Sequence, residues 1–110
     1  MDKKELAEKI KQFALLVKKE FPVRMVILFG AWLEGLARED DEIEVAVVVD
    51  LLDEDYVESR TKMVKLGRTI DRRIEPIIIE KKRKDPVGFF QEVLDNGKVI
   101  WQDHHHAAAL

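Results

Sequence analysis

Apolar side chains recur at helical spacing in two long segments of the chain. Over residues 3–21 they fall every three or four positions, with charged residues between them: Leu6, Ile10, Phe13, Ala14 and Val17. This spacing predicts an amphipathic helix that ends at Pro22, because proline cannot continue a helix. Residues 56–73 predict a second long helix, with Val57, Val64 and Ile70 facing inward.

Three shorter runs, rich in β-branched residues, predict strands. Residues 23–29 are almost entirely apolar, which is typical of a central strand that is buried on both faces. Residues 42–49 begin with alternating acidic and apolar positions and become continuously apolar, which predicts a second strand. Residues 74–79 predict a third strand. It contains Pro76, which lacks an N–H, so we expect an edge strand or a bulge there.

The remaining segments complete the expected order of elements. Residues 31–37 contain helix formers and predict one or two helical turns. Asp85 and Pro86 predict the N-cap and first position of a helix that Asn96 and Gly97 close. Its expected inward side chains are Phe89, Phe90, Val93 and Leu94. Residues 99–101 predict a last short strand. The fold class is therefore α/β (α+β), with a mixed three- to four-stranded sheet flanked by helices.

Length and composition indicate one small domain. The chain has 110 residues, of which 46% are hydrophobic and 37% charged, values that exclude both a disordered chain and a membrane protein. We expect the domain to span residues 3–102. Residues 103–110 are expected to form a disordered tail, partly a cloning scar, and His104 to His106 are either natural or derived from a tag. With no signal segment at its start, the chain is expected to be cytoplasmic.

Charge and cysteine content narrow the possible ligands. Nineteen basic and 22 acidic residues give a net charge of −3, which argues against generic nucleic-acid binding but allows a local nucleotide site. The sequence has no cysteine, so it has neither disulfides nor thiolate metal ligands.

Candidate chemistry gathers around the first two predicted strands. Gly30 ends the first strand, and ten residues separate Ala31 from Glu42. Alternation along a strand puts Glu42 and Glu44 on one face, and Glu75 opens the next strand in the same way. If the two strands are neighbours, three carboxylates converge at one end of the sheet. Carboxylates together with substrate phosphates are the usual ligands of Mg²⁺.

This pattern resembles the minimal nucleotidyltransferases of the DNA polymerase β superfamily. Their motif is Gly-Ser, about ten residues, then Asp-x-Asp, with a third carboxylate on a later strand. The resemblance implies a small nucleotidyltransferase fold, MgATP or another nucleoside triphosphate (NTP) as donor, and transfer of a nucleoside monophosphate to a hydroxyl. It implies that the carboxylates of Glu42, Glu44 and Glu75 are the catalytic metal ligands. It also implies that the nucleotide lies against Gly30, Ala31, Trp32 and Gly35.

The chain departs from the family motif at its most sensitive positions. Ala31 replaces the serine, and Glu42 and Glu44 replace the two aspartates. Each glutamate is one methylene longer, and misplacing a ligand by about 1 Å can cost on the order of 100-fold in rate. We therefore expect weak or lost catalysis. The alternative that the resemblance implies is a non-catalytic antitoxin or partner-binding module acting on a HEPN-domain protein. A third reading is an engineered or drifted scaffold without activity.

Several features of the sequence each allow two interpretations. Trp32 either stacks on a base or plugs the site, and Arg72 and Arg73 either reach the triphosphate or complement the end of a helix. The basic run at residues 81–84 either contacts a nucleic acid or acidic partner, or is a solvated turn. An exposed edge at the third strand could pair with another copy of the chain, although Pro76 argues against a long ladder.

Overall fold

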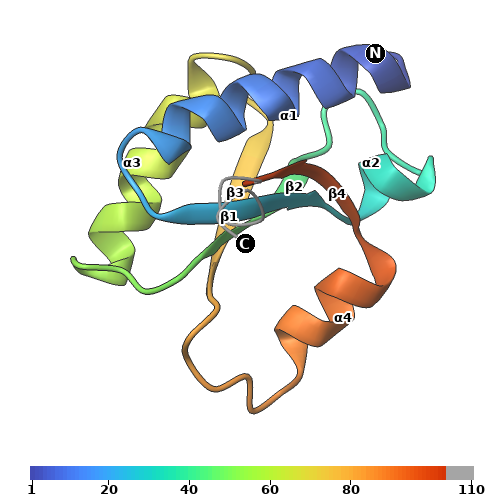
Figure 1. The fold of residues 1–110 in the computed structure, drawn as a ribbon. Coiled ribbons are helices and arrows are strands. Elements are labelled where there is room, and N and C mark those ends of the chain that lie inside the picture. The colour runs from blue at the N-terminus through green and yellow to red at the C-terminus, as the bar shows by residue number, and fades with distance from the viewer. Residues whose placement is uncertain (104–110) are drawn as a thin grey trace.

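A computed structural model describes residues 1–103 as a four-stranded sheet with helices on both faces (Figure 1). The elements, in chain order, are α1 (Lys3–Lys18), β1 (Val23–Leu28), α2 (Ala31–Glu34), β2 (Ile43–Val49), α3 (Tyr56–Arg68), β3 (Ile74–Glu80), α4 (Phe89–Asn96) and β4 (Lys98–Gln102). The predicted tail, including His104 to His106, lies outside the described residues apart from Asp103. Of the helices in residues 1–103, none is long and apolar enough to cross a membrane.

The strands lie in the order β3-β2-β1-β4, which confirms the expected mixed sheet. β1 pairs antiparallel with both β2 and β4, whereas β2 and β3 run parallel. The predicted central position of β1 and the predicted last strand are therefore correct. Because β2 and β3 are parallel neighbours, Glu44 and Glu75 are paired in register at the start of the two strands.

The larger part of the core lies between the sheet and the helices α1 and α3. The five apolar positions predicted to face inward on α1 are all buried. On α3 the prediction for Val57 is wrong, because Val57 is 67% exposed and the buried residues are Ser59, Met63 and Gly67. Val64 is half-buried, and Ile70, just beyond the helix, is half-buried against the core. Ser59 has a small side chain and Gly67 has none, so the helix can approach its neighbours closely. A Cβ on Gly67 would meet Ile74 at 3.0 Å.

Pro76 lies in an edge strand, as predicted. The bonds from the N–H of Ile43 to the carbonyl of Arg73 and from the N–H of Lys81 to the carbonyl of Val49, both 2.7 Å, fix the phase of the parallel pair. Odd-numbered residues of β3 therefore bond to β2, and Pro76 and Ile78 point their backbone groups outward. The missing N–H of Pro76 consequently costs the ladder no hydrogen bond.

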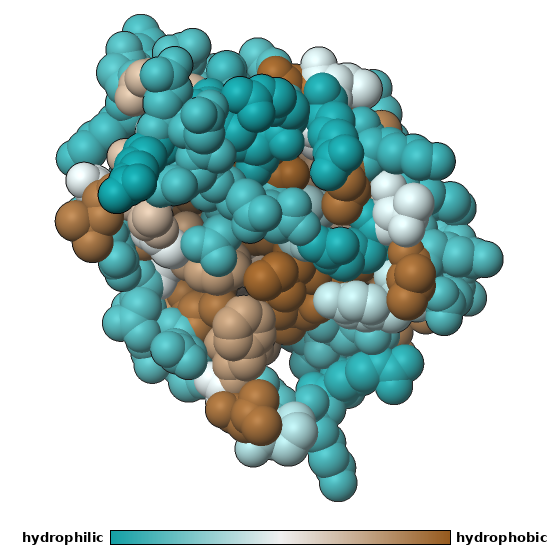
Figure 2. Space-filling model, turned by 180° about the vertical axis from the view of Figure 1, so that it is seen from behind, coloured by the Kyte–Doolittle hydropathy of each residue, from teal (hydrophilic) through white to brown (hydrophobic). Residues whose placement is uncertain are grey.

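The opposite face of the sheet is covered only in part, by α4 (Figure 1). Its buried residues form a smaller cluster: Ile27, Ala46, Val48, Ile79 and Val93. Seen from behind, hydrophobic atoms gather in the centre and lower part of the molecule (Figure 2). Of the predicted inward side chains of α4, Phe89 and Phe90 are half-buried, whereas Leu94 is exposed.

The helix α4 begins three residues later than the first predicted helical position. Gly88 is its N-cap, and a turn closed by the bond from the N–H of Gly88 to the carbonyl of Asp85, at 3.0 Å, precedes it. The carboxylate of Asp85 still accepts from the N–H groups of Phe90 and Gln91, each at 3.2 Å. Asp85 therefore caps the helix across the turn, and the helix ends at Gly97 as expected.

Candidate functional site

The junction between β1 and α2 brings the backbone of Gly30 against a carboxylate. Gly30 has φ +79° and ψ −157°, a conformation that favours glycine. A Cβ at this position would overlap the Oε2 atom of Glu44. The structure therefore places Glu44 over Gly30, so that the two ends of the predicted motif are in contact.

An open hollow lies beside this contact. It is lined by Ala31, Asp40, Asp41, Glu42 and Glu44. Glu42 lies one residue before β2 and is exposed, whereas Glu44 is half-buried. All lining residues except Ala31 carry carboxylates, so the hollow offers oxygen ligands of the kind that hard divalent cations prefer.

Glu75 is placed differently from Glu44, although the two are neighbours across the strands. Its Oε1 atom is paired with a terminal nitrogen of Arg60, which belongs to α3. In residues 1–103 no three Asp, Glu, His or Cys side chains lie close enough together to hold a metal ion. The structure thus brings Glu42 and Glu44 to one hollow and holds Glu75 on Arg60. A role for all three as metal ligands stays a prediction.

Trp32 is held in place by the loop between α2 and β2. Its indole N–H donates to the carbonyl of Asp41 at 2.9 Å, and the guanidinium of Arg73 lies 5.2 Å from the centre of its ring. Trp32 also packs against the main core. These contacts show what holds the ring in place, and both interpretations of Trp32, as a plug or as a platform for a base, stay predictions.

Asp71 and Arg73 tie this loop to the rest of the fold. Arg73 donates to both carboxylate oxygens of Asp71, at 2.9 and 2.7 Å, and to the carbonyl of Glu39 at 2.6 Å. Lys9 of α1 donates to the same carboxylate at 2.8 Å. Hydrogen bonds from Arg73 hold the pKa of Asp71 well below its ordinary value, and those from Lys9 add to the effect. The hydrogen-bonded carboxylate raises the pKa of Arg73 in turn.

The remaining predicted site residues occupy supporting positions. Gly35 is the C-cap of α2, with φ +76°, and a Cβ there would meet nothing within 4 Å. Arg72 pairs with Asp40 at 3.1 Å between two exposed side chains. The prediction that Arg73 interacts with the end of a helix is incomplete, because its main partners are Asp71 and Trp32. Sequence reasoning missed Arg60 and Lys9, since their partners lie 15 and 62 positions away.

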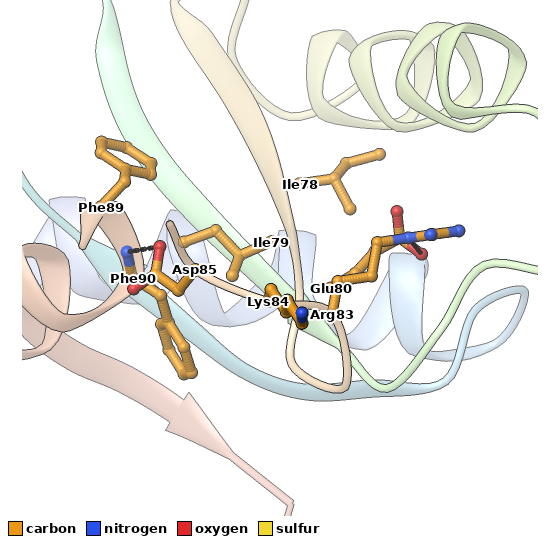
Figure 3. A pocket seen from close by; sticks show the side chains of 8 residues that line it. All are labelled: Ile78, Ile79, Glu80, Arg83, Lys84, Asp85, Phe89 and Phe90. Atoms are coloured by element: carbon orange, nitrogen blue, oxygen red, sulfur yellow. Dashed lines mark hydrogen bonds and ion pairs between the residues drawn. The ribbon is translucent and has the colours of Figure 1, made fainter. Parts of the chain in front are cut away.

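A second hollow lies on the same face of the sheet, toward the other end of β3 (Figure 3). Phe89 and Phe90 of α4 and the end of β3 line it, together with Arg83 and Lys84. Arg83 pairs with Glu80 at 2.8 Å. All four residues of the basic run at 81–84 are exposed in the turn after β3, so both interpretations of this run stay predictions.

Comparisons with known structures agree with this architecture. A protein of Sulfolobus solfataricus, provisionally named a nucleotidyltransferase, is 20% identical with a TM-score of 0.64; the match covers 91% of this chain and 83% of that one. A toxin–antitoxin structure with AMP-PNP is 19% identical with a TM-score of 0.65, over 94% and 78% of the two chains. At these identities the likeness shows the fold. A comparison with curated proteins gave no significant match.

A third similar structure is that of a substituted protein. It is a mutant of the toxin–antitoxin pair MntA–HepT in which two aspartates, two positions apart, are replaced by glutamates. It is 22% identical with a TM-score of 0.61, over 92% of this chain and 78% of that one. Glu42 and Glu44 have the same residue type and spacing as that substituted pair.

A match of the sequence to a known family identifies the family of this chain. Residues 8–106 match the polymerase beta nucleotidyltransferase family, which is nearly the whole chain. The match includes both strands of the motif, the glycine junction and the paired carboxylates described above. The chain therefore belongs to the polymerase beta nucleotidyltransferase family.

Proposed function

We propose that the chain binds a magnesium complex of a nucleoside triphosphate such as ATP beside Gly30. We further propose that it transfers the nucleoside monophosphate to a hydroxyl at a strongly reduced rate. The observation that carries the proposal is the contact of the Glu44 carboxylate with Gly30, beside a hollow that Glu44, Glu42 and Ala31 line. Family membership supplies the reaction class.

The residues present fit one magnesium–nucleotide complex. Magnesium is commonly held by one or two carboxylates together with substrate phosphates, and Glu42 and Glu44 can provide the carboxylates. A bound magnesium ion would neutralise charge on the phosphates and on the departing pyrophosphate. The backbone at Gly30 and Ala31 would lie along the phosphates, but Ala31 offers no hydroxyl to bond them.

The charge of the hollow makes the cation essential for binding. Among the described residues that line it, four are acidic and none is basic. These carboxylates would repel a free triphosphate, whereas a magnesium ion coordinated by both the carboxylates and the phosphates would offset that repulsion. We therefore propose that nucleotide binding depends on the cation, and that the longer glutamates place it poorly for transfer.

Calorimetric titration of ATP and GTP, with and without Mg²⁺, tests this proposal. Binding should require Mg²⁺ and weaken at least tenfold in Glu42→Gln and Glu44→Gln. Glu58→Gln is the matched control, because this exposed glutamate on α3 does not line the hollow. Absence of binding at millimolar nucleotide, or equal binding without Mg²⁺, would contradict the proposal.

A second candidate function is partner binding, with or without catalysis. The face of the sheet under α4 is only partly covered, and Val87 and Leu94 beside it are 86% and 37% exposed. Similar structures are toxin–antitoxin complexes. We propose that a helical HEPN-domain protein covers this face.

Co-elution with a HEPN-domain protein encoded beside this chain would test partner binding. Leu94→Glu should weaken the complex, because it puts a charge on the apolar face. Leu15→Glu is the control, since Leu15 is 51% exposed on α1 at the other face of the sheet. A complex that both variants weaken equally, or no complex, would contradict this assignment.

A further inference from the structure

Arg60 reaches from α3 to the outer edge of the sheet and binds two groups there. Its Nε–H donates to the carbonyl of Pro76 at 3.1 Å, and a terminal nitrogen is paired with the carboxylate of Glu75. One planar guanidinium therefore bridges a backbone oxygen and a neighbouring side chain. This forked geometry suits arginine and not lysine.

The strand edge determines where Arg60 lies. Pro76 and Ile78 present their carbonyls outward, where no strand of the described sheet donates to them. Arg60 donates to the first, and the hydroxyl of Tyr56, one helical turn earlier, lies 3.4 Å from the second. Because positions four apart share a helix face, α3 supplies donors to successive outward carbonyls. The guanidinium is thus fixed beside Glu75 by the fold as well as by charge.

The two in-register glutamates consequently face different partners. The carboxylate of Glu44 lies over Gly30, toward α2, while that of Glu75 is paired with Arg60 of α3. Two carboxylates on neighbouring strands would repel each other unless a cation lies close by. Arg60 provides that positive charge, so the charge of Glu75 is compensated without a metal ion.

We propose that Arg60 takes the place of a second cation, so that the site holds a single divalent ion on Glu42 and Glu44. This inference rests on the proposed function, because it concerns the cation that accompanies the nucleotide. Arg60 acts as a positioning residue: it holds Glu75 away from the hollow. A divalent ion at Glu75 would have to displace the guanidinium or lie beside it, and both are unfavourable.

The test is the number of Mn²⁺ ions bound in the presence of AMP-PNP. Mn²⁺ substitutes for Mg²⁺, and the free ion is counted by electron paramagnetic resonance. The wild type should bind one Mn²⁺ per chain. Arg60→Gln, which keeps a polar side chain and removes the charge, should bind two. The double variant Arg60→Gln/Glu75→Gln should bind one again.

Arg68→Gln is the matched control. It removes one positive charge from the exposed last turn of the same helix, and it should still bind one ion. Thermal unfolding followed by circular dichroism shows that each variant is folded at the temperature of the titration. A folded Arg60→Gln that binds one ion, or a wild type that binds two, would overturn the inference and leave the proposed function standing. No binding of Mn²⁺ and AMP-PNP by either protein would overturn both.

Discussion

The Oε2 atom of Glu44 occupies the space that a side chain at Gly30 would need. This contact joins the end of the first strand to the acidic position of the second. It makes glycine necessary at position 30 for two separate reasons: the positive φ of the backbone and the presence of the carboxylate. The two reasons can be separated by experiment.

We predict that Gly30→Ala lowers the free energy of unfolding by about 1–3 kcal/mol from backbone strain, with an added cost from the overlap. Gly35→Ala is the comparison, because Gly35 also has positive φ but nothing lies within 4 Å of its Cβ position. Urea unfolding measures both. In a Glu44→Ala background the overlap is gone, so Gly30→Ala should cost less there. An equal cost in both backgrounds would contradict the role of Glu44.

The buried carboxylate of Asp71 gives a prediction about pH. Its pKa is lowered in the folded state by hydrogen bonds from Arg73 and Lys9. A lowered folded pKa contributes stability above the unfolded value, near 3.8, which is lost as the pH falls through the folded value. The free energy of unfolding of the wild type should therefore decline steeply below about pH 4. In Asp71→Asn this part of the decline should be absent.

The same variant should also be less stable at neutral pH. Removal of one partner leaves the charges of Arg73 and Lys9 without their carboxylate, which costs about 1.5–3 kcal/mol. Asp53→Asn, at an exposed position, is the control and should change little. If the two variants have the same pH profile, the lowered pKa of Asp71 is not the cause of the acid instability.

Substitution by lysine should affect the two adjacent arginines, Arg72 and Arg73, differently. Arg73 binds Asp71 through two nitrogens, donates to the carbonyl of Glu39 and lies over Trp32. Lysine can reproduce the charge but not this planar fork, so Arg73→Lys should cost about 1–3 kcal/mol. Arg72→Lys should cost little, because Arg72 is 76% exposed. Tryptophan fluorescence should shift only in the first variant as Trp32 becomes more mobile. An equal effect of both would contradict the assignment.

Restoring the family motif should raise catalysis. Ala31→Ser with Glu42→Asp and Glu44→Asp shortens both ligands and returns the hydroxyl. We expect nucleotidyl transfer to rise on the order of 10- to 100-fold, since a misplacement of about 1 Å can cost that much. Release of pyrophosphate from ATP with Mg²⁺ measures it. Glu39→Asp, outside the motif, is the control. An unchanged rate would show that these three positions do not limit the reaction.

The periodic segments of the fold could be predicted, because one local rule governs each of them. The burial of α1 follows from its apolar spacing, and the edge position of β3 follows from Pro76. The phase of α3 could not be predicted in this way, since small residues at Ser59 and Gly67 turn inward where the packing is close. The start of α4 was missed because Asp85 caps the helix across a turn instead of directly.

The candidate site likewise has a part that could be predicted from the sequence and a part that could not. Contact between Gly30 and Glu44 agrees with the spacing of the motif, because Gly30 follows β1, Glu44 lies in β2, and these two strands pair. The state of Glu75 depends on Arg60, which approaches from a helix around the edge of the sheet. Asp71 and Lys9 pair although they lie 62 positions apart in the sequence. Such contacts depend on the assembled fold, and no short sequence pattern encodes them.

The outward side of β3 has a consequence for self-association. Proline at position 76 removes one donor, and Arg60 and Tyr56 occupy the carbonyls of Pro76 and Ile78. An incoming strand would find few free bonding groups along this edge of the described sheet, so the edge formed by β4 is the better site for strand addition. A fibre grows by strand addition only if both edge strands of each molecule can pair with a strand of another molecule. Joining through β4 alone would therefore stop at two copies with one continuous sheet, and the β3 edge disfavours open-ended growth along the sheet.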